Sequence, residues 1–172
     1  MMKLVIPSIE YKESYLEALQ GFVKEGYCPE GEAERYKSDF QGAVEEELNR
    51  SNPDKMTEVQ RGILISVFWL VEGDQFLGRV SIKHTLNDFL FKYAGNIGYI
   101  INPFRRKQGH GKLILELALE KAKELGLGKA LLTCDSDNIG SKKIIEANGG
   151  VFENEVHMEG NPALKRRYWI EL

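Results

Sequence analysis

A short basic turn with two glycines, residues 105–112, separates an apolar run from a long amphipathic segment. The apolar run has the composition of a strand, and the segment after the turn has the apolar spacing of a helix. Backbone N–H groups at a helix start lack intrahelical partners, and the helix dipole places partial positive charge there. The turn adds four cationic side chains: Arg105, Arg106, Lys107 and Lys112. This combination favours a cradle for a phosphate-bearing cofactor, although an ordinary capped helix start has similar residues.

Two common nucleotide-binding motifs do not fit this turn. A Walker loop has a glycine five residues before Gly111, where this chain has Arg106, and Ser or Thr after the lysine, where it has Leu113. A dinucleotide fingerprint has a third glycine at the position of Ile114. The sequence therefore excludes an ordinary P-loop NTPase and a Rossmann dehydrogenase.

The spacing that does fit is Arg-x-x-Gly-x-Gly, formed by Arg106, Gly109 and Gly111. It resembles the acetyl-CoA-binding motif of the GNAT N-acetyltransferases, which often have a proline where Pro103 stands. A second segment, residues 138–150, resembles the half-site of that family in which an asparagine opens a helix that ends in glycines. The resemblance is strong over about residues 95–152, weaker over 63–87 and poor over the first fifty or so.

The resemblance implies acetyl-CoA as co-substrate, with a residue set for each of its parts. Backbone N–H groups of the turn would bind the pyrophosphate, the edge of the preceding strand would pair with the pantetheine arm, and the N–H of Ile101 would stabilise the oxyanion of the tetrahedral intermediate. We expect His110 to be exposed and to contribute its backbone alone. The expected cofactor-binding residues are Ile100, Ile101, Arg106, Lys107, Gln108, Gly109, His110, Gly111, Lys112, Asn138, Ser141 and Lys142.

The reaction implied is acetyl transfer to a primary amine, which must lose a proton before it attacks. Many family members use a glutamate and a tyrosine, but the aligned positions here are Asn96 and Ile145. Tyr99, Cys134 and Asp135 are the nearest alternatives, and each also suits a purely structural role; among them we take Tyr99 and Asp135 as the candidate catalytic side chains. Direct attack assisted by ordered water is a further alternative. A non-catalytic acyl-CoA-binding sensor is the competing hypothesis.

Acceptor recognition is expected from the N-terminal helices, the hairpin and the C-terminal strands. Near the hairpin, polar side chains suit either a carboxylate-bearing or polar acceptor or a plain surface: Arg79, Lys83, Asn87 and Asp88. Several aromatic residues suit either a pocket wall or the core: Tyr27, Tyr36, Tyr168 and Trp169. The acceptor is therefore predicted only as a small-molecule, amino-acid or peptide amine.

The composition predicts a single domain over residues 1–172. A net charge of −3 disfavours nucleic acid as the main partner, and no apolar stretch is long enough for a membrane span. The chain start lacks signal-peptide character, and two widely separated cysteines suit a reducing cytoplasm. No Cys or His spacing suggests a metal site. The resembled family often forms dimers, so a homodimer is possible.

The order of elements predicts an α/β fold of the mixed α+β type. We expect strands at 4–6, 63–71, 75–83, 96–101, 130–133, 151–152 and 168–172, and helices at 11–26, 39–50, 111–125 and 138–147. Residues 27–38, with Pro29 and Gly31, read as a loop. By resemblance, this is a GNAT-like central mixed, mostly antiparallel sheet flanked by helices. Its central strands, 96–101 and 130–133, would splay apart to admit the cofactor.

Overall fold

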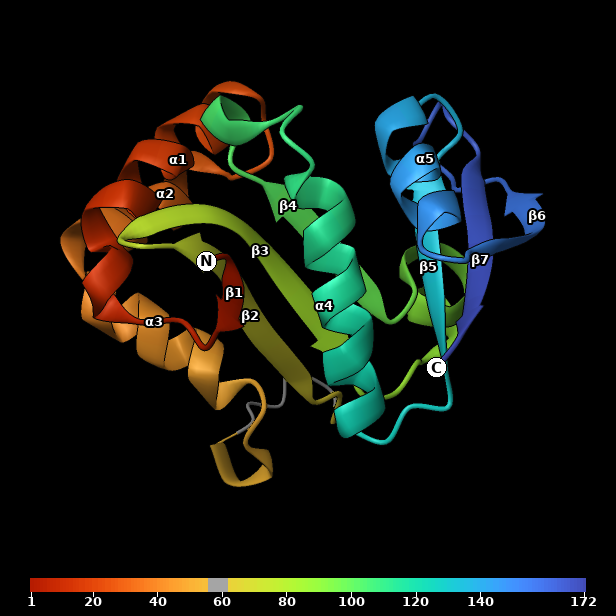
Figure 1. The fold of residues 1–172 in the computed structure, drawn as a ribbon, viewed down its shortest axis with the longest axis horizontal. Helices are drawn as coiled ribbons and strands as arrows, with labels where there is room; N and C mark the ends of the chain where they lie inside the picture. The colour runs from red at the N-terminus through yellow and green to blue at the C-terminus, as the bar shows by residue number, and fades with distance from the viewer. Residues whose placement is uncertain (56–61) are drawn as a thin grey trace.

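Two antiparallel sheets, placed side by side, organise the protein (Figure 1). A computed structural model describes residues 1–55 and 62–172. The first sheet has the order β1-β2-β3-β4, with bounds Lys3–Val5, Ile65–Glu72, Gln75–Lys83 and Ile97–Ile101. The second has the order β5-β7-β6, with bounds Lys129–Asp135, Lys165–Glu171 and Val151–Val156. The predicted fold class is confirmed.

Helices cover both faces of the first sheet. The helices α1 (Lys12–Lys24), α2 (Glu30–Ser38) and α3 (Phe40–Asn49) lie on one face, and α4 (His110–Glu124) lies on the other (Figure 1). Side chains alternate between these layers, so buried Trp69 packs with the first group and its neighbour Leu70 with α4. Helix α5 (Ile139–Ala147) packs beside β5 and α4. No described helix has both the length and the apolar composition needed to cross a lipid bilayer.

Helix α2 corrects the expectation of a loop over residues 27–38. Pro29 precedes the helix and Asp39 follows it. Ala33 and Tyr36 are each 1% exposed and pack into the aromatic core formed with α1 and α3. Because only two residues of this nine-residue helix are buried, its apolar period is too weak to detect in the sequence, and tertiary packing stabilises it.

The two sheets meet at one end of β4 and β5. Asn96 N–H donates to the Leu131 carbonyl at 2.7 Å, and Leu131 N–H donates to Asn96 Oδ1 at 2.9 Å. The Asn96 side-chain amide also donates to the Lys83 carbonyl at 3.1 Å. Gly95 beside it has φ +70, and a Cβ there would lie 2.3 Å from the Leu131 carbonyl oxygen. Beyond this junction β4 and β5 belong to separate sheets, which is the predicted splay.

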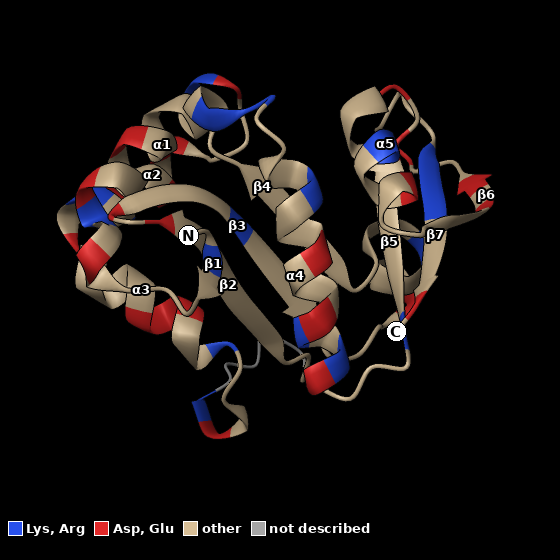
Figure 2. Ribbon diagram, in the orientation of Figure 1, with Lys and Arg blue, Asp and Glu red and all other residues tan. Residues whose placement is uncertain are grey.

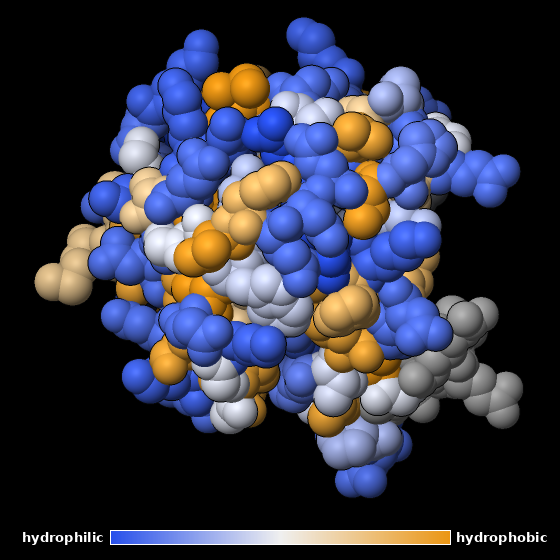
Figure 3. All heavy atoms as spheres, turned by 90° about the vertical axis from the view of Figure 1, so that its right-hand side faces the viewer, coloured by the Kyte–Doolittle hydropathy of each residue, from blue (hydrophilic) through white to orange (hydrophobic). Residues whose placement is uncertain are grey.

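The outer edge of the second sheet is open to solvent. Strand β6 lies at the sheet edge, and Val151 and Phe152 at its start are 69% and 51% exposed. The space-filling view of this side shows hydrophobic groups scattered among hydrophilic ones (Figure 3). The described side chains on this side thus form a mixed surface.

Candidate active site

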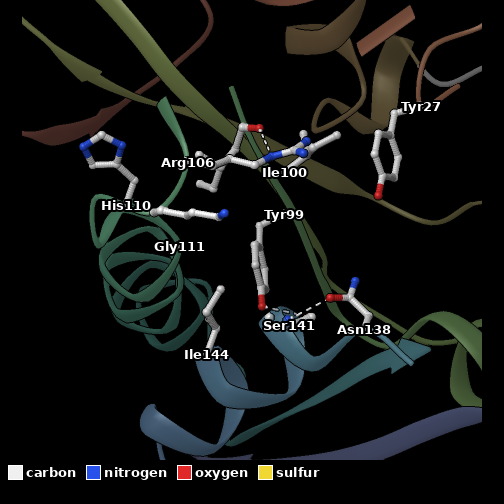
Figure 4. Close-up of a pocket in the computed structure, with 12 residues that line it drawn as sticks. Tyr27, Tyr99, Ile100, Arg106, His110, Gly111, Asn138, Ser141 and Ile144 are labelled. Atoms are coloured by element: carbon white, nitrogen blue, oxygen red, sulfur yellow. Dashed lines mark hydrogen bonds between the residues drawn. The ribbon is translucent and has the colours of Figure 1, made fainter. Parts of the chain in front are cut away.

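A cavity of about 490 Å³ lies where the two sheets separate. One wall is the end of β4 with the loop that enters α4, and the opposite wall is the start of α5 (Figure 4). The residues that line it are Tyr27, Tyr99, Ile100, Ile101, Arg106, Lys107, His110, Gly111, Asn138, Gly140, Ser141 and Ile144. Eight of these were predicted to bind the cofactor and a ninth, Tyr99, was a catalytic candidate.

The loop between β4 and α4 is shaped by its own hydrogen bonds and by unusual backbone angles. Asn102 accepts from Phe104 N–H and donates to the Phe76 carbonyl, both at 3.0 Å, which ties the loop to β3. Lys107 and Gly109 have φ values of 60° and 86°, in the left-handed region. Glycine adopts this conformation without strain, so Gly109 permits the turn from which α4 starts. The loop is rich in basic residues (Figure 2).

Four successive backbone N–H groups at this turn are available to a ligand. Within residues 1–55 and 62–172, the amides of 108–111 donate to no protein acceptor, and the first helical bonds are those of Lys112 and Leu113 to the Gly109 carbonyl. The helix dipole adds positive potential at the same place. The turn therefore has the donors and the sign of potential that an anion requires.

His110 differs from the sequence expectation. We expected an exposed ring, but His110 is 5% exposed, and its Nδ1 lies 2.8 Å from the Arg105 carbonyl oxygen. Because a carbonyl only accepts, Nδ1 carries the proton in this contact. The ring thus braces the loop from within, through a contact with a residue five positions earlier that the neighbouring glycines did not reveal.

Arg106 joins the loop to the N-terminal helices. Its guanidinium donates to both carboxylate oxygens of Glu25 at 2.9 and 2.6 Å, and its Nε donates to the Ile101 carbonyl at 3.4 Å. It also lies 5.9 Å from the ring centroid of Tyr27, which is exposed and lines the cavity. The motif arginine is therefore already paired, and no local pattern in the sequence pointed to Glu25 as its partner.

The open edge of β4 is turned towards the cavity. Ile100 lies opposite Arg79 in the register, and Asn102 N–H donates across to the Leu77 carbonyl at 2.9 Å. Backbone groups in an antiparallel pair alternate in direction, so the N–H groups of Tyr99 and Ile101 point away from β3. Within the described chain no strand pairs with that edge over Ile97–Ile101.

Two hydroxyl groups face each other across the cavity. Tyr99 Oη, from β4, lies 3.0 Å from Ser141 Oγ, from α5 (Figure 4). Asn138 caps α5 by accepting from Ser141 N–H at 3.0 Å, which fixes the serine in place. Burial raises the pKa of Tyr99 to about 12, so its hydroxyl stays protonated and can donate.

Five predicted site residues lie outside the cavity lining: Gln108, Gly109, Lys112, Lys142 and Asp135. The first three belong to the turn, where their backbone amides matter more than their side chains. Asp135 is engaged elsewhere, because Lys165 Nζ lies 2.6 Å from its carboxylate and Asn161 donates to it at 2.9 Å.

Gly140 and Ile144 line the cavity but were not proposed from the sequence as site residues. A Cβ on Gly111 would lie 2.5 Å from Ile144 Cδ1, so this glycine lets α4 and α5 approach closely. Ile144 is partly buried, and an apolar residue at helical spacing offers no local signal that distinguishes a cavity wall from the core.

The positions of the usual acid and base cannot supply either role here. Ile145 is fully buried in the core. Both polar ends of the Asn96 side chain are occupied by the junction between the sheets. None of the described residues that line the cavity is a carboxylate.

Solved structures of acetyltransferases share this fold, and three of them illustrate the likeness. Mycobacterium smegmatis RimJ in complex with CoA-disulfide has a TM-score of 0.71 at 13% identity, over 99% of this chain and 81% of that one. The microcin self-immunity acetyltransferase MccE, with acetyl-CoA and AMP, has a TM-score of 0.66 at 15% identity, over 99% and 92%. A Salmonella typhimurium acetyl transferase that modifies the N-terminal serine of a 50S ribosomal subunit protein has a TM-score of 0.66 at 14% identity, over 99% and 95%.

Comparison with curated proteins found no match. The family model of the Acetyltransferase (GNAT) domain, in contrast, matches residues 18–151. This match includes β4, the loop with its unpaired amides, and the start of α5, which together form the cavity. The chain therefore belongs to the GNAT family of acetyltransferases.

Proposed function

We propose that this protein, as one domain over residues 1–172, transfers the acetyl group of acetyl-CoA to a primary amine of a small molecule, amino acid or peptide. The observation that carries the proposal is the row of free amides at 108–111 beside an unpaired strand edge. The first suits a pyrophosphate and the second suits the amides of a pantetheine arm. The solved structures of RimJ, in complex with CoA-disulfide, and of MccE, in complex with acetyl-CoA and AMP, are consistent with this assignment.

Ile101 and its neighbours would activate the thioester. With the pyrophosphate at the turn, the pantetheine extends along β4 as an added strand, and the carbonyl of the thioester approaches Ile101 N–H. That N–H points towards the cavity, so it stabilises the negative charge that develops on the carbonyl oxygen. The amine nitrogen bonds to the carbonyl carbon, and the carbon–sulfur bond then breaks. The amine loses one proton and the CoA thiolate takes up one.

The Tyr99–Ser141 pair would assist departure of the thiolate. Tyr99 remains protonated because its pKa is raised to about 12, and the hydrogen bond to Ser141 holds the two hydroxyls near the expected position of sulfur. A hydrogen bond to the thiolate stabilises it before solvent supplies the proton. The cavity lining described above contains no carboxylate to take up the proton, so we expect the amine to lose it to water before it attacks.

Calorimetry and thiol release test the proposal. We expect saturable binding of CoA in clear preference to ATP, and release of free thiol from acetyl-CoA when an amine panel is supplied. Preference for ATP would overturn the cofactor assignment. Tight CoA binding without turnover on any amine would overturn the transfer reaction and favour an acyl-CoA sensor.

A further inference from the structure

A cluster of three cations with one carboxylate lies on the face of the first sheet that α1, α2 and α3 cover. Arg79 and Lys83 extend from β3, and Arg50 follows the end of α3. Glu47 of α3 accepts from Arg79 Nε at 2.6 Å and from Trp69 Nε1 at 3.3 Å. Figure 2 shows basic colour on the body of β3, inside the layer of helices. The charges of Arg79 and Glu47 thus cancel each other. This carboxylate does not neutralise the positive charges of Lys83 and Arg50.

Neither Lys83 nor Arg50 has a carboxylate partner within the described part of the chain. Both side chains are partly buried. Burial, followed by the positive charges of Arg50 and Arg79, lowers the pKa of Lys83 to about 8. Burial, followed by the charge of Arg79, also lowers the pKa of Arg50. Because these positive charges are partly buried and repel one another, a bound anion would stabilise the cluster.

Gly98 leaves room beside the Lys83 ammonium. A Cβ at Gly98 would lie 3.7 Å from Lys83 Nζ and 3.6 Å from Ser81 Oγ, so the ammonium lies over the backbone of β4. Ser81 Oγ in turn donates to the Gly98 carbonyl at 3.4 Å. Lys83 is therefore held against the strand that also forms the cavity wall.

The register places this ammonium near the reacting centre. Ile100 is opposite Arg79 and Gly98 is opposite Ser81, so their side chains share one face with Lys83. Ile100 also lines the cavity. Three residues along a strand span roughly 10 Å, which separates the expected thioester position at Ile101 from the site beside Gly98.

We propose that the acceptor amine carries an oxyanion, a carboxylate or a phosphonate, that binds Lys83 and Arg50 while its amine faces the thioester near Ile101. The separation excludes a carboxylate on the amine-bearing carbon and fits one that lies several bonds away. This inference rests on the proposed acetyl transfer and defines the class of its substrate.

Matched acceptors test the proposal at neutral pH. The acceptors are γ-aminobutyrate, aminopropylphosphonate and the neutral γ-aminobutyramide, each assayed for kcat/KM with acetyl-CoA. We expect the wild-type protein to favour the anionic amines over the amide by about tenfold or more. Comparison of the two anionic amines distinguishes carboxylate from phosphonate as the preferred group.

Variants of one lysine assign the preference to its site. Lys83→Met keeps the length of the side chain and should bring the ratio of kcat/KM for the acid to kcat/KM for the amide close to one. Lys83→Arg should retain the preference for the acid. Lys123→Met, on an exposed turn of α4, is the control and should behave as wild type. CoA affinity should be the same in all variants, which shows that each is folded.

Two results would overturn the inference while leaving acetyl transfer intact: equal kcat/KM for acid and amide in the wild type, or a preference that survives in Lys83→Met. If CoA binds but none of the amines reacts, titration of γ-aminobutyrate and its amide into the CoA-bound protein gives the same comparison. Equal affinity of the CoA-bound protein for γ-aminobutyrate and for its amide would also overturn the inference. Failure of the proposed function shows instead as absence of CoA binding or of turnover on the whole amine panel.

Discussion

In the proposed reaction, stabilisation of the leaving thiolate depends most directly on Tyr99. Tyr99→Phe removes the hydroxyl that lies 3.0 Å from Ser141 and keeps the ring. We expect kcat to fall by about tenfold to a hundredfold, as for loss of a positioned proton donor, with CoA affinity nearly unchanged. Steady-state kinetics and calorimetry measure the two quantities. An unchanged kcat would show that the hydroxyl only supports the wall.

The absence of a carboxylate from the described cavity lining leads to a pH prediction. With a simple monoamine acceptor, log kcat/KM should rise by one unit per pH unit as the free base increases, up to the amine pKa near ~10.4. Tyr99, with its pKa of about 12, does not titrate in this range. An acceptor without an anionic group avoids the effect of Lys83. A plateau that begins near neutral pH would reveal an unrecognised general base.

Local spacing predicted many of the residues that line the cavity, but it did not predict their partners. Arg106 and the glycines were found because the motif is contiguous. Glu25 was not, because it is 81 positions away in the sequence and its pairing exists only in three dimensions. The roles of Asn96 and Ile145 followed the same rule: the sequence shows which residue is absent, and the structure shows what the replacement does.

At the scale of elements, the turn into α4 depends on the left-handed angle at Gly109. Gly109→Ala should strain the turn by roughly 1–2 kcal/mol and shift the free amides, because an L side chain disfavours this conformation. We expect CoA to bind about tenfold more weakly, as measured by calorimetry. No described atom lies within 4 Å of a Cβ there, so the effect is conformational rather than steric.

Gly31→Ala is the matched control for that substitution. Gly31 lies in α2, has no positive φ, and has no described neighbour within 4 Å of the position that a methyl group would take. CoA affinity should therefore be unchanged, and stability should rise slightly. If Gly109→Ala, shown to be folded by circular dichroism, binds CoA as tightly as this control, the turn is not the anion site.

The strongly periodic elements were predicted within a few residues, and α2 was not. Strands β2 and β3 and helix α4 each present a continuous apolar face, which is what a sequence pattern can reveal. Helix α2 has mostly charged residues and depends on Ala33 and Tyr36 finding the core of α1 and α3. The five-residue helical turn Leu90–Ala94 also has no buried residue and showed no periodic signal.

At the scale of the whole molecule, the cavity walls come from two sheets, so a cofactor should connect them. We expect saturating CoA to slow hydrogen exchange in α5 and β5 as well as in α4, with α2 little affected. A ligand at a hundred times its Kd stabilises the folded state by about 2.7 kcal/mol. Exchange mass spectrometry measures this. Slowing confined to α4 would mean that the ligand contacts only one wall.

The Asn96 junction has a mechanical consequence. Its four hydrogen bonds fasten β3, β4 and β5 at the apex of a wedge, whereas nearer the mouth the Tyr99–Ser141 hydrogen bond joins the two walls. A small rotation about the apex is magnified with distance from it, so the mouth widens or narrows most. Such a pivot would allow the grip on a bulky thioester to be adjusted, with the apolar cluster that the two sheets share repacking around it.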